Sequence, residues 1–209
     1  MNEQATKRMT EDEVDDDALR AGVWRLLGSL LADVPADDVL TMLRGLQPDD
    51  GQEGDPEASD MTRAWSVLHR SADEADHAAL RREYQDVFIG VGGGEITPYA
   101  SYYGSGQLMD KALVDLRNDL IMLGVERQQG VCEPEDHVAA VCEAMALAIE
   151  DEAVDVNWQS EFFRRHIDSW MGECLHDLKT AASARFYRGV AEFGLAFIAL
   201  ERRYLGGAA

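Results

Sequence analysis

The spacing of apolar residues constrains the fold of this 209-residue chain more than any other feature of its sequence. From Leu19 to Tyr204, apolar side chains recur at intervals of three and four residues, which is typical of amphipathic helices. The sequence contains no convincing run of apolar–polar alternation and no internal repeat. The clearest stripe lies between Ala184 and Leu205: Phe186, Val190, Phe193, Phe197, Leu200 and Tyr204. We therefore predict an all-α fold, a single-domain bundle of roughly 8–11 helices.

Proline, glycine and charged runs divide the predicted bundle into parts. We expect a disordered tail over residues 1–14, a helical domain over 15–205 and a second tail over 206–209. Residues 90–98 and 124–134 are predicted to be loop or hinge regions.

Several predicted helix boundaries follow from caps and breakers. A first helix is expected to start near Asp15, and a fourth to run from about Asp76 to Ile89, with Gly90 as its C-terminal cap. Another should span Gln107 to Leu123. Pro134 is expected at the first position of the helix that runs to about Glu152.

Charge and cysteine content limit the partners and the compartment. The 40 acidic and 19 basic residues give a net charge of −21, which repels nucleic acid and anionic lipid and attracts basic partners. No apolar run approaches the roughly 18–20 residues that span a membrane, and residues 1–17 hold no apolar signal core. The three cysteines are too few and too scattered for a disulfide framework. A reducing cytoplasm is the expected location.

Two Glu-x-x-His pairs, Glu74 with His77 and Glu173 with His176, leave a metalloprotein as the alternative function. Di-iron bundles use this spacing, together with an inward glutamate from each of two further helices. The apolar face of the first predicted helix, Asp15–Ala32, contains no such glutamate. We therefore assign no metal ligand, and the helical-bundle metalloprotein stays the alternative to a binding protein.

The segments that would suit nucleotide binding or catalysis lack the required context. Gly90-x-Gly92-Gly93-Gly94 follows a helix and precedes Glu95 rather than a lysine, so a flexible hinge is the better interpretation. Asp136-His137 with Ser101 or Cys132 has no spacing that supports a catalytic triad. We predict no catalytic residue and no cofactor. Asp136, two residues after Pro134, could instead meet the free amides of that helix's first turn.

Peptide binding fits the remaining features better. Tyr99, Tyr102 and Tyr103 lie in a predicted Gly/Pro/Ser loop, where tyrosines supply amphipathic contact area. Apolar and aromatic anchors beside Glu133, Glu135 and Asp136 would suit a segment that is both apolar and basic.

Three segments resemble the TorD/DmsD-type redox-enzyme maturation chaperones in composition and order. They are Tyr84-x-x-Val87-Phe88-x-Gly90, Pro98-Tyr99-x-Ser101-x-Tyr103 and Glu133-Pro134-x-Asp136-His137. Trp170 followed by Arg185-Phe186-Tyr187 is also similar, and the likeness covers roughly residues 18–205. This sequence departs from the family at Val87, where leucine is usual, and in the triple glycine before Glu95.

The resemblance implies an all-helical cytoplasmic chaperone without enzymatic activity. Such proteins bind the twin-arginine signal peptide, or the apoprotein, of a molybdenum-cofactor enzyme until the cofactor is inserted. The implied partner is therefore a molybdoenzyme precursor with a basic signal peptide. The sequence around Asp136 most resembles that of family members associated with formate dehydrogenases. The chaperone would be a monomer or a homodimer, in which helices can be exchanged between protomers.

The peptide-binding residues that the resemblance implies come from all three segments. They are Tyr84, Val87, Phe88, Pro98, Tyr99, Ser101, Tyr103, Glu133, Asp136 and His137. Asp136 and His137 are expected at the lip of a groove, where the Asp136 carboxylate would meet a guanidinium of the client.

Overall fold

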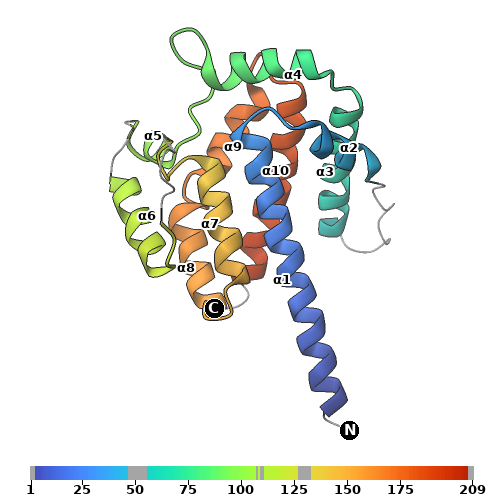
Figure 1. The fold of residues 1–209 in the computed structure, drawn as a ribbon, viewed down its shortest axis with the longest axis vertical. Coiled ribbons are helices and arrows are strands. Elements are labelled where there is room, and N and C mark those ends of the chain that lie inside the picture. Colours follow the sequence, from blue (N-terminus) through green and yellow to red (C-terminus); the bar gives the residue numbers. More distant parts are fainter. Residues whose placement is uncertain (1–2, 47–55, 107, 109–110, 127–132, 207–209) are drawn as a thin grey trace.

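The structure, a computed structural model, describes residues 3–46, 56–106, 108, 111–126 and 133–206. Over these ranges the chain forms a single domain of ten α-helices and one π-helical turn, η1, without a β-strand (Figure 1). The elements are α1 Glu3–Ala32, α2 Asp37–Gly45, α3 Pro56–Asp73, α4 His77–Tyr84, η1 Gln85–Ile89, α5 Ala100–Ser105, α6 Lys111–Met122, α7 Val138–Glu150, α8 Val156–His166, α9 Met171–Thr180 and α10 Phe186–Gly206. The predicted all-α fold is confirmed. In the described ranges, each helix is too short or too polar to traverse a bilayer.

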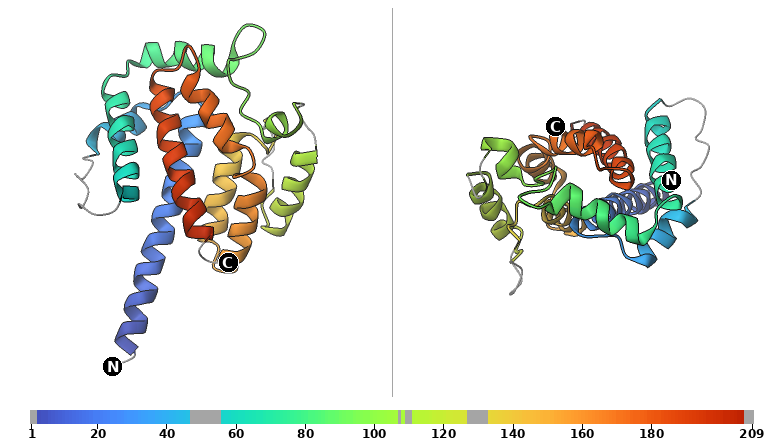
Figure 2. Two further views of the ribbon diagram at one scale, coloured as in Figure 1. Left: turned by 180° about the vertical axis from the view of Figure 1, so that it is seen from behind. Right: turned by 90° about the horizontal axis from the view of Figure 1, so that it is seen from above.

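The core of the bundle is built around α1, α7 and α10, each of which carries many buried apolar residues. The views in Figure 2 show α1 along α7, and α10 against α3 and α9. Trp24 of α1 is fully buried, with its ring centroid 4.9 Å from Phe197 of α10 and 6.3 Å from Phe163 of α8. Burying such a side chain contributes about 1.5–3 kcal/mol, so this aromatic cluster is a main source of stability.

The predicted stripe on α10 is right in its first half and wrong in its last two turns. Leu200 and Tyr204 are exposed, whereas Glu201 and Leu205 face the core. The reason is electrostatic, because Glu201 meets the buried guanidinium of Arg20, while the Tyr204 ring covers that guanidinium at 4.0 Å. A buried ion pair therefore interrupts the apolar face.

The first helix begins earlier than predicted. α1 starts at Glu3 rather than near Asp15, so helix runs through the residues predicted to form a tail. Figure 1 shows this N-terminal part projecting from the bundle. Residues 3–14 are mostly good helix formers such as Glu, Gln, Ala, Lys, Arg and Met. The prediction relied on an apolar face, which a helix projecting from the bundle does not need.

The predicted fourth helix is two elements. α4 ends at Tyr84, and the chain continues as the π-helical turn η1 to Ile89. Gly90 is at the C-terminal cap, as predicted, but its N–H donates to the carbonyl of Gln85 at 2.6 Å, five residues back. Wider turns of this kind are frequent at functional sites.

Three other elements differ from the prediction. The tyrosine-rich segment expected to be a loop contains the short helix α5, and the helix expected from Gln107 is α6, which begins at Lys111. Residue 107 lies outside the described residues. The helix expected to start at Pro134 starts at Val138, as α7, and ends at Glu150.

The glycine-rich segment after η1 folds tightly back onto η1. Gly90 has a φ of +54°, and a Cβ there would lie 2.0 Å from the carbonyl oxygen of Gly93. A Cβ on Gly94 would lie 2.4 Å from the carbonyl carbon of Phe88. Only glycine fits these two positions. The role of this segment as a hinge for helix exchange between protomers stays a prediction, which the mass of the protein in solution tests.

Two carboxylates fix this part of the chain to the start of α10. Buried Glu83 accepts hydrogen bonds from the backbone N–H groups of Arg185 at 2.7 Å and Tyr187 at 2.8 Å. Glu95 accepts one from the Ser183 N–H at 3.1 Å, and its hydrogen bonds to Ser183 hold the pKa of Glu95 below its usual value. Together these bonds hold α4 and η1 in a fixed position above the bundle.

Candidate functional site

The segments that precede α5 and α7 are joined to each other, although they are far apart in the sequence. Tyr99 and His137 form an isolated antiparallel bridge. Two backbone N–H groups donate across it, from Ala100 to the carbonyl of Asp136 at 3.0 Å and from Val138 to the carbonyl of Pro98 at 2.9 Å. Since α5 begins at Ala100 and α7 at Val138, the bridge holds two helix N-termini side by side.

Asp136 is fully buried, and its carboxylate bonds to the backbone of the protein itself. Oδ2 accepts a hydrogen bond at 3.0 Å from the backbone N–H of Ser101, in the first turn of α5. Oδ1 is buried and has no hydrogen-bond donor among the described residues. The expectation that Asp136 meets the amides of the helix that follows it is therefore wrong. It caps a different helix, because the bridge brings α5 within reach.

Replacing Asp136 with alanine is expected to lower the free energy of unfolding by about 1–2 kcal/mol, the usual cost of a lost N-cap. Asparagine should cost less, because its amide oxygen can accept the same hydrogen bond from Ser101. Unfolding in urea, followed by far-ultraviolet circular dichroism, measures both changes. An alanine variant as stable as the wild type would contradict the capping role.

His137 caps α7 and packs on Tyr99. Its Nδ1 accepts a hydrogen bond at 3.3 Å from the backbone N–H of Ala139, and its ring meets the Tyr99 ring edge-on at 5.1 Å. Burial lowers the pKa of His137 to about 4, against a smaller opposing effect of the Asp136 charge. At neutral pH the imidazole is therefore uncharged, with its proton on Nε2.

A groove of about 780 Å³ lies beside this bridge. One wall is the α6 side, through Leu120, Ile121 and Val125, and another wall is one face of α7. The α7 face consists of His137, Ala139, Ala140, Glu143, Ala144 and Leu147. Small alanine side chains on α7 leave room between the walls, so the groove is open and mostly apolar.

Aromatic side chains of α4 and η1 form the third wall. The ring centroids of Tyr84 and Phe88 are 5.0 Å apart, and Phe88 meets Tyr187 edge-on at the same distance. The Tyr84 hydroxyl donates to the carbonyl of Ala32, at the end of α1, at 2.8 Å. Burial, with the nearby charges of Asp33 and Glu133, raises the pKa of Tyr84 to about 12. Tyr84 is therefore a fixed, uncharged wall residue.

The charges of the groove are predominantly negative. Its lining, taken over the described residues, includes four glutamates, Glu126, Glu133, Glu135 and Glu143, and one cation, Arg117. Arg117 Nη2 lies 2.8 Å from Glu135 Oε2. An apolar groove with this excess of carboxylates matches a ligand that is both apolar and cationic.

The structure brings together six of the ten predicted binding residues, and these line the groove: Tyr84, Phe88, Pro98, Tyr99, Glu133 and His137. The other four lie outside its lining. Val87, Ser101 and Asp136 are fully buried, and the Tyr103 hydroxyl donates to Asp177 at 3.1 Å. These four residues support the elements that form the walls.

The α6 wall, including Arg117 and Ile121, was not predicted from the sequence. Helical spacing in α6 indicates an apolar face toward the core, and Leu113, Leu116 and Leu120 are buried there. Ile121 lies off that stripe and is 72% exposed. An apolar residue outside the buried face of its helix, as Ile121 is, was the sequence signal that could have indicated a binding surface.

The two Glu-x-x-His pairs do not assemble a metal site. Glu74, Glu173 and His176 are exposed, and His77 lies at the start of α4 with Nδ1 3.5 Å from Asp37 Oδ1. In the part of the chain that the structure describes, no group of three or more His, Cys, Asp or Glu side chains could hold a metal ion. The alternative based on these pairs is therefore wrong, because a di-iron bundle needs such a group in its interior.

The chain is similar to a known protein family and to two chaperones of known sequence. Residues 55–176 match the family model described as nitrate reductase delta subunit. The chaperone protein TorD of Vibrio cholerae serotype O1 (strain M66-2) is 28% identical over 179 residues, which cover 80% of this chain and 79% of that protein. The chaperone protein TorD of Vibrio parahaemolyticus serotype O3:K6 is 26% identical over 153 residues, or 68% of this chain and 71% of that protein.

A crystal structure of a candidate redox enzyme maturation protein from Archaeoglobus fulgidus has a similar fold. The TM-score is 0.54 at 18% identity, over 90% of this chain and 94% of that chain. At this identity the likeness bears on the fold alone.

Proposed function

Because the chain belongs to the nitrate reductase delta subunit family, of the TorD/DmsD type, we propose that its groove binds the twin-arginine signal peptide of a molybdoenzyme precursor. The chain is a redox-enzyme maturation chaperone. The proposed role is to hold the precursor in the cytoplasm until its cofactor is inserted. It requires binding and no catalysis.

The observation that carries this proposal is the combination of apolar walls with an excess of carboxylates in one groove. A twin-arginine segment has two guanidiniums followed by an apolar stretch. Guanidiniums form strong charge-assisted hydrogen bonds with carboxylates, such as those of Glu126 and Glu133. The apolar stretch would lie along Phe88, Ile121 and Leu147. Both parts of the peptide therefore have a counterpart in the groove.

The length of the groove limits how many residues of the peptide it can contact. The α7 wall runs from residue 137 to residue 147, ten residue steps, or about 15 Å at the helical rise. An extended chain advances about 3.3 Å per residue, so four or five peptide residues fit along this wall. The groove would then contact the arginine pair and the first apolar residues after it.

The proposal is tested by calorimetric titration with a peptide that carries two arginines followed by an apolar stretch. Binding should weaken as salt is raised, because ions screen the attraction between exposed charges over about 8–10 Å. Glu133→Gln should raise Kd about tenfold, since a hydrogen bond to a charged group contributes about 1.5 kcal/mol or more.

Glu152→Gln is the matched control, because Glu152 is an exposed carboxylate outside the groove. Its Kd should stay within twofold of the wild type. Affinity that is indifferent to salt and to Glu133→Gln would count against arginine recognition in this groove.

The proposal also extends to the identity of the precursor that the chaperone binds. The Glu-Pro-Glu-Asp-His segment at residues 133–137 resembles that of members associated with formate dehydrogenases. We expect a formate dehydrogenase precursor to accompany the chaperone when it is purified from native cytoplasm. Mass spectrometry of the co-purified proteins, with and without Glu133→Gln, identifies the precursor.

A further inference from the structure

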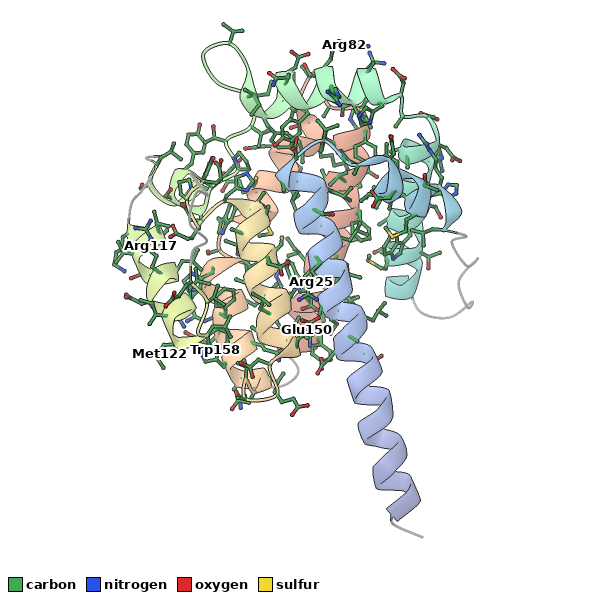
Figure 3. The ribbon with its side chains drawn as sticks, in the orientation of Figure 1. Arg25, Arg82, Arg117, Met122, Glu150 and Trp158 are labelled. Atoms are coloured by element: carbon green, nitrogen blue, oxygen red, sulfur yellow. The ribbon has the colours of Figure 1, made fainter. Side chains whose placement is uncertain are left out.

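Arg117 is the one cationic side chain in the described lining of the groove, and it forms an ion pair with one of the carboxylates of the groove. Its Nε lies 3.1 Å and its Nη2 2.8 Å from the same oxygen, Glu135 Oε2. Figure 3 shows Arg117 on α6, whereas Glu135 comes from the segment before α7. The pair therefore connects two walls of the groove.

We infer that Arg117 is an internal competitor that sets the affinity of the groove for arginine: it holds Glu135 as a counterion until an arginine of the bound peptide takes its place. The inference rests on the proposed function, because it concerns what the same groove accepts. A peptide without a cationic side chain has nothing to offer Glu135 in exchange. Arg117 would thus lower the affinity for arginine-bearing segments without changing the affinity for segments that are only apolar.

The two partners differ in how firmly they are held. The Glu135 side chain is 17% exposed, and it lies in the segment that the Tyr99–His137 bridge fixes. The Arg117 side chain is 46% exposed and reaches over on a long, flexible stem. In an exchange of cations, the carboxylate stays in the groove wall and the guanidinium of Arg117 swings away.

The geometry of the pair also favours exchange. Both nitrogens of Arg117 converge on one oxygen, so the pair lacks the two parallel hydrogen bonds of a full bidentate arrangement. Partly exposed pairs of this kind contribute little to stability. An incoming guanidinium can therefore compete for Glu135 at small cost.

Asp136 supplies a second negative charge near Arg117. The pKa of Arg117 is raised, first by its hydrogen bond with Glu135 and further by the charges of Glu135 and Asp136. Both charges hold the Arg117 guanidinium at this wall of the groove, so an incoming guanidinium has to compete with Arg117 for them.

The test compares wild-type protein with Arg117→Met, using two peptides. One carries the arginine pair followed by an apolar stretch, and the other has glutamine at both arginine positions. Arg117→Met should tighten binding of the arginine peptide about 3–10-fold, because the internal competitor is gone. Affinity for the glutamine peptide should change by less than about twofold. Circular dichroism melting shows that both proteins are folded.

Two further variants separate masking of Glu135 from a general change in charge. Arg164→Met removes the same charge from an exposed pair on α8, where Arg164 lies 2.6 Å from Glu161 and outside the groove. It should leave both affinities unchanged. In a Glu135→Gln background, Arg117→Met should no longer tighten binding, because the masked carboxylate is absent.

Equal tightening for both peptides would overturn the inference, since Arg117 would then only obstruct space. Unchanged or weaker binding of the arginine peptide by Arg117→Met, while the wild type binds it, would overturn the inference and leave the proposed function standing. If neither protein binds the arginine peptide, the proposed function fails and the inference fails with it.

Discussion

Replacing Glu201 with alanine is expected to lower the free energy of unfolding by about 3–5 kcal/mol, because it removes the buried counterion of Arg20 and leaves only the partly exposed Asp17 paired with that guanidinium. Glu201 is 1% exposed, and its two oxygens accept hydrogen bonds from Arg20 at 2.8 and 3.0 Å. The indole N–H of Trp24 donates to the same carboxylate at 3.1 Å. Alanine would thus leave two buried donors, Arg20 Nε and Trp24 Nε1, without an acceptor between α1 and α10. Urea unfolding measures the loss.

A matched control is Glu192→Ala on the same helix. Glu192 is paired with Lys179 at 3.5 Å, with both side chains partly exposed, so the cost should be about 0–1 kcal/mol. The double substitution Arg20→Met with Glu201→Leu should recover most of the loss, because it removes both buried charges. If Glu201→Ala unfolds at the same urea concentration as Glu192→Ala, the Arg20–Glu201 pair does not have this structural role.

Acid is expected to destabilise the protein partly through His137. The pKa of His137 is about 4 in the folded protein, because of burial, against an ordinary value of 6.5 when unfolded. Between these values the unfolded state binds the proton and the folded state does not. Stability from this residue is therefore fully present above pH 6.5 and is lost as the pH falls toward 4. The loss is about 3 kcal/mol at 1.36 kcal/mol per pH unit.

His137→Asn tests this dependence, because asparagine is a preferred N-cap and does not titrate. The difference in unfolding free energy between wild type and variant should change by about 3 kcal/mol from pH 7 to pH 4, in favour of the variant at low pH. His176→Asn, at an exposed position, should follow the wild type. His166 has a pKa lowered by burial and acts in the same direction, but it is present in all three proteins. Parallel pH profiles for wild type and His137→Asn would contradict the assignment.

The sequence by itself determined the fold class and three of the chain segments that line the groove. Helical spacing is a local property of each segment, so the all-α fold and the buried positions Phe186, Val190 and Phe193 could be predicted without tertiary information. The family resemblance rests on short motifs, and six of the ten residues taken from them line one groove. Local pattern and motif order are enough for these conclusions because neither depends on which distant segments meet.

Only the tertiary structure decided which groups meet across the bundle. The carboxylate of Asp136 caps α5 rather than its own helix because backbone hydrogen bonds join segments some 35 positions apart in the chain, as the separation of Ser101 and Asp136 shows. Glu201 lies inside α10's apolar face because Arg20, 181 positions away, neutralises it. The α6 wall and its Arg117 enter the groove through packing that no periodicity encodes. Hydrogen bonds and ion pairs between distant segments require their approach, and the approach is a property of the folded chain.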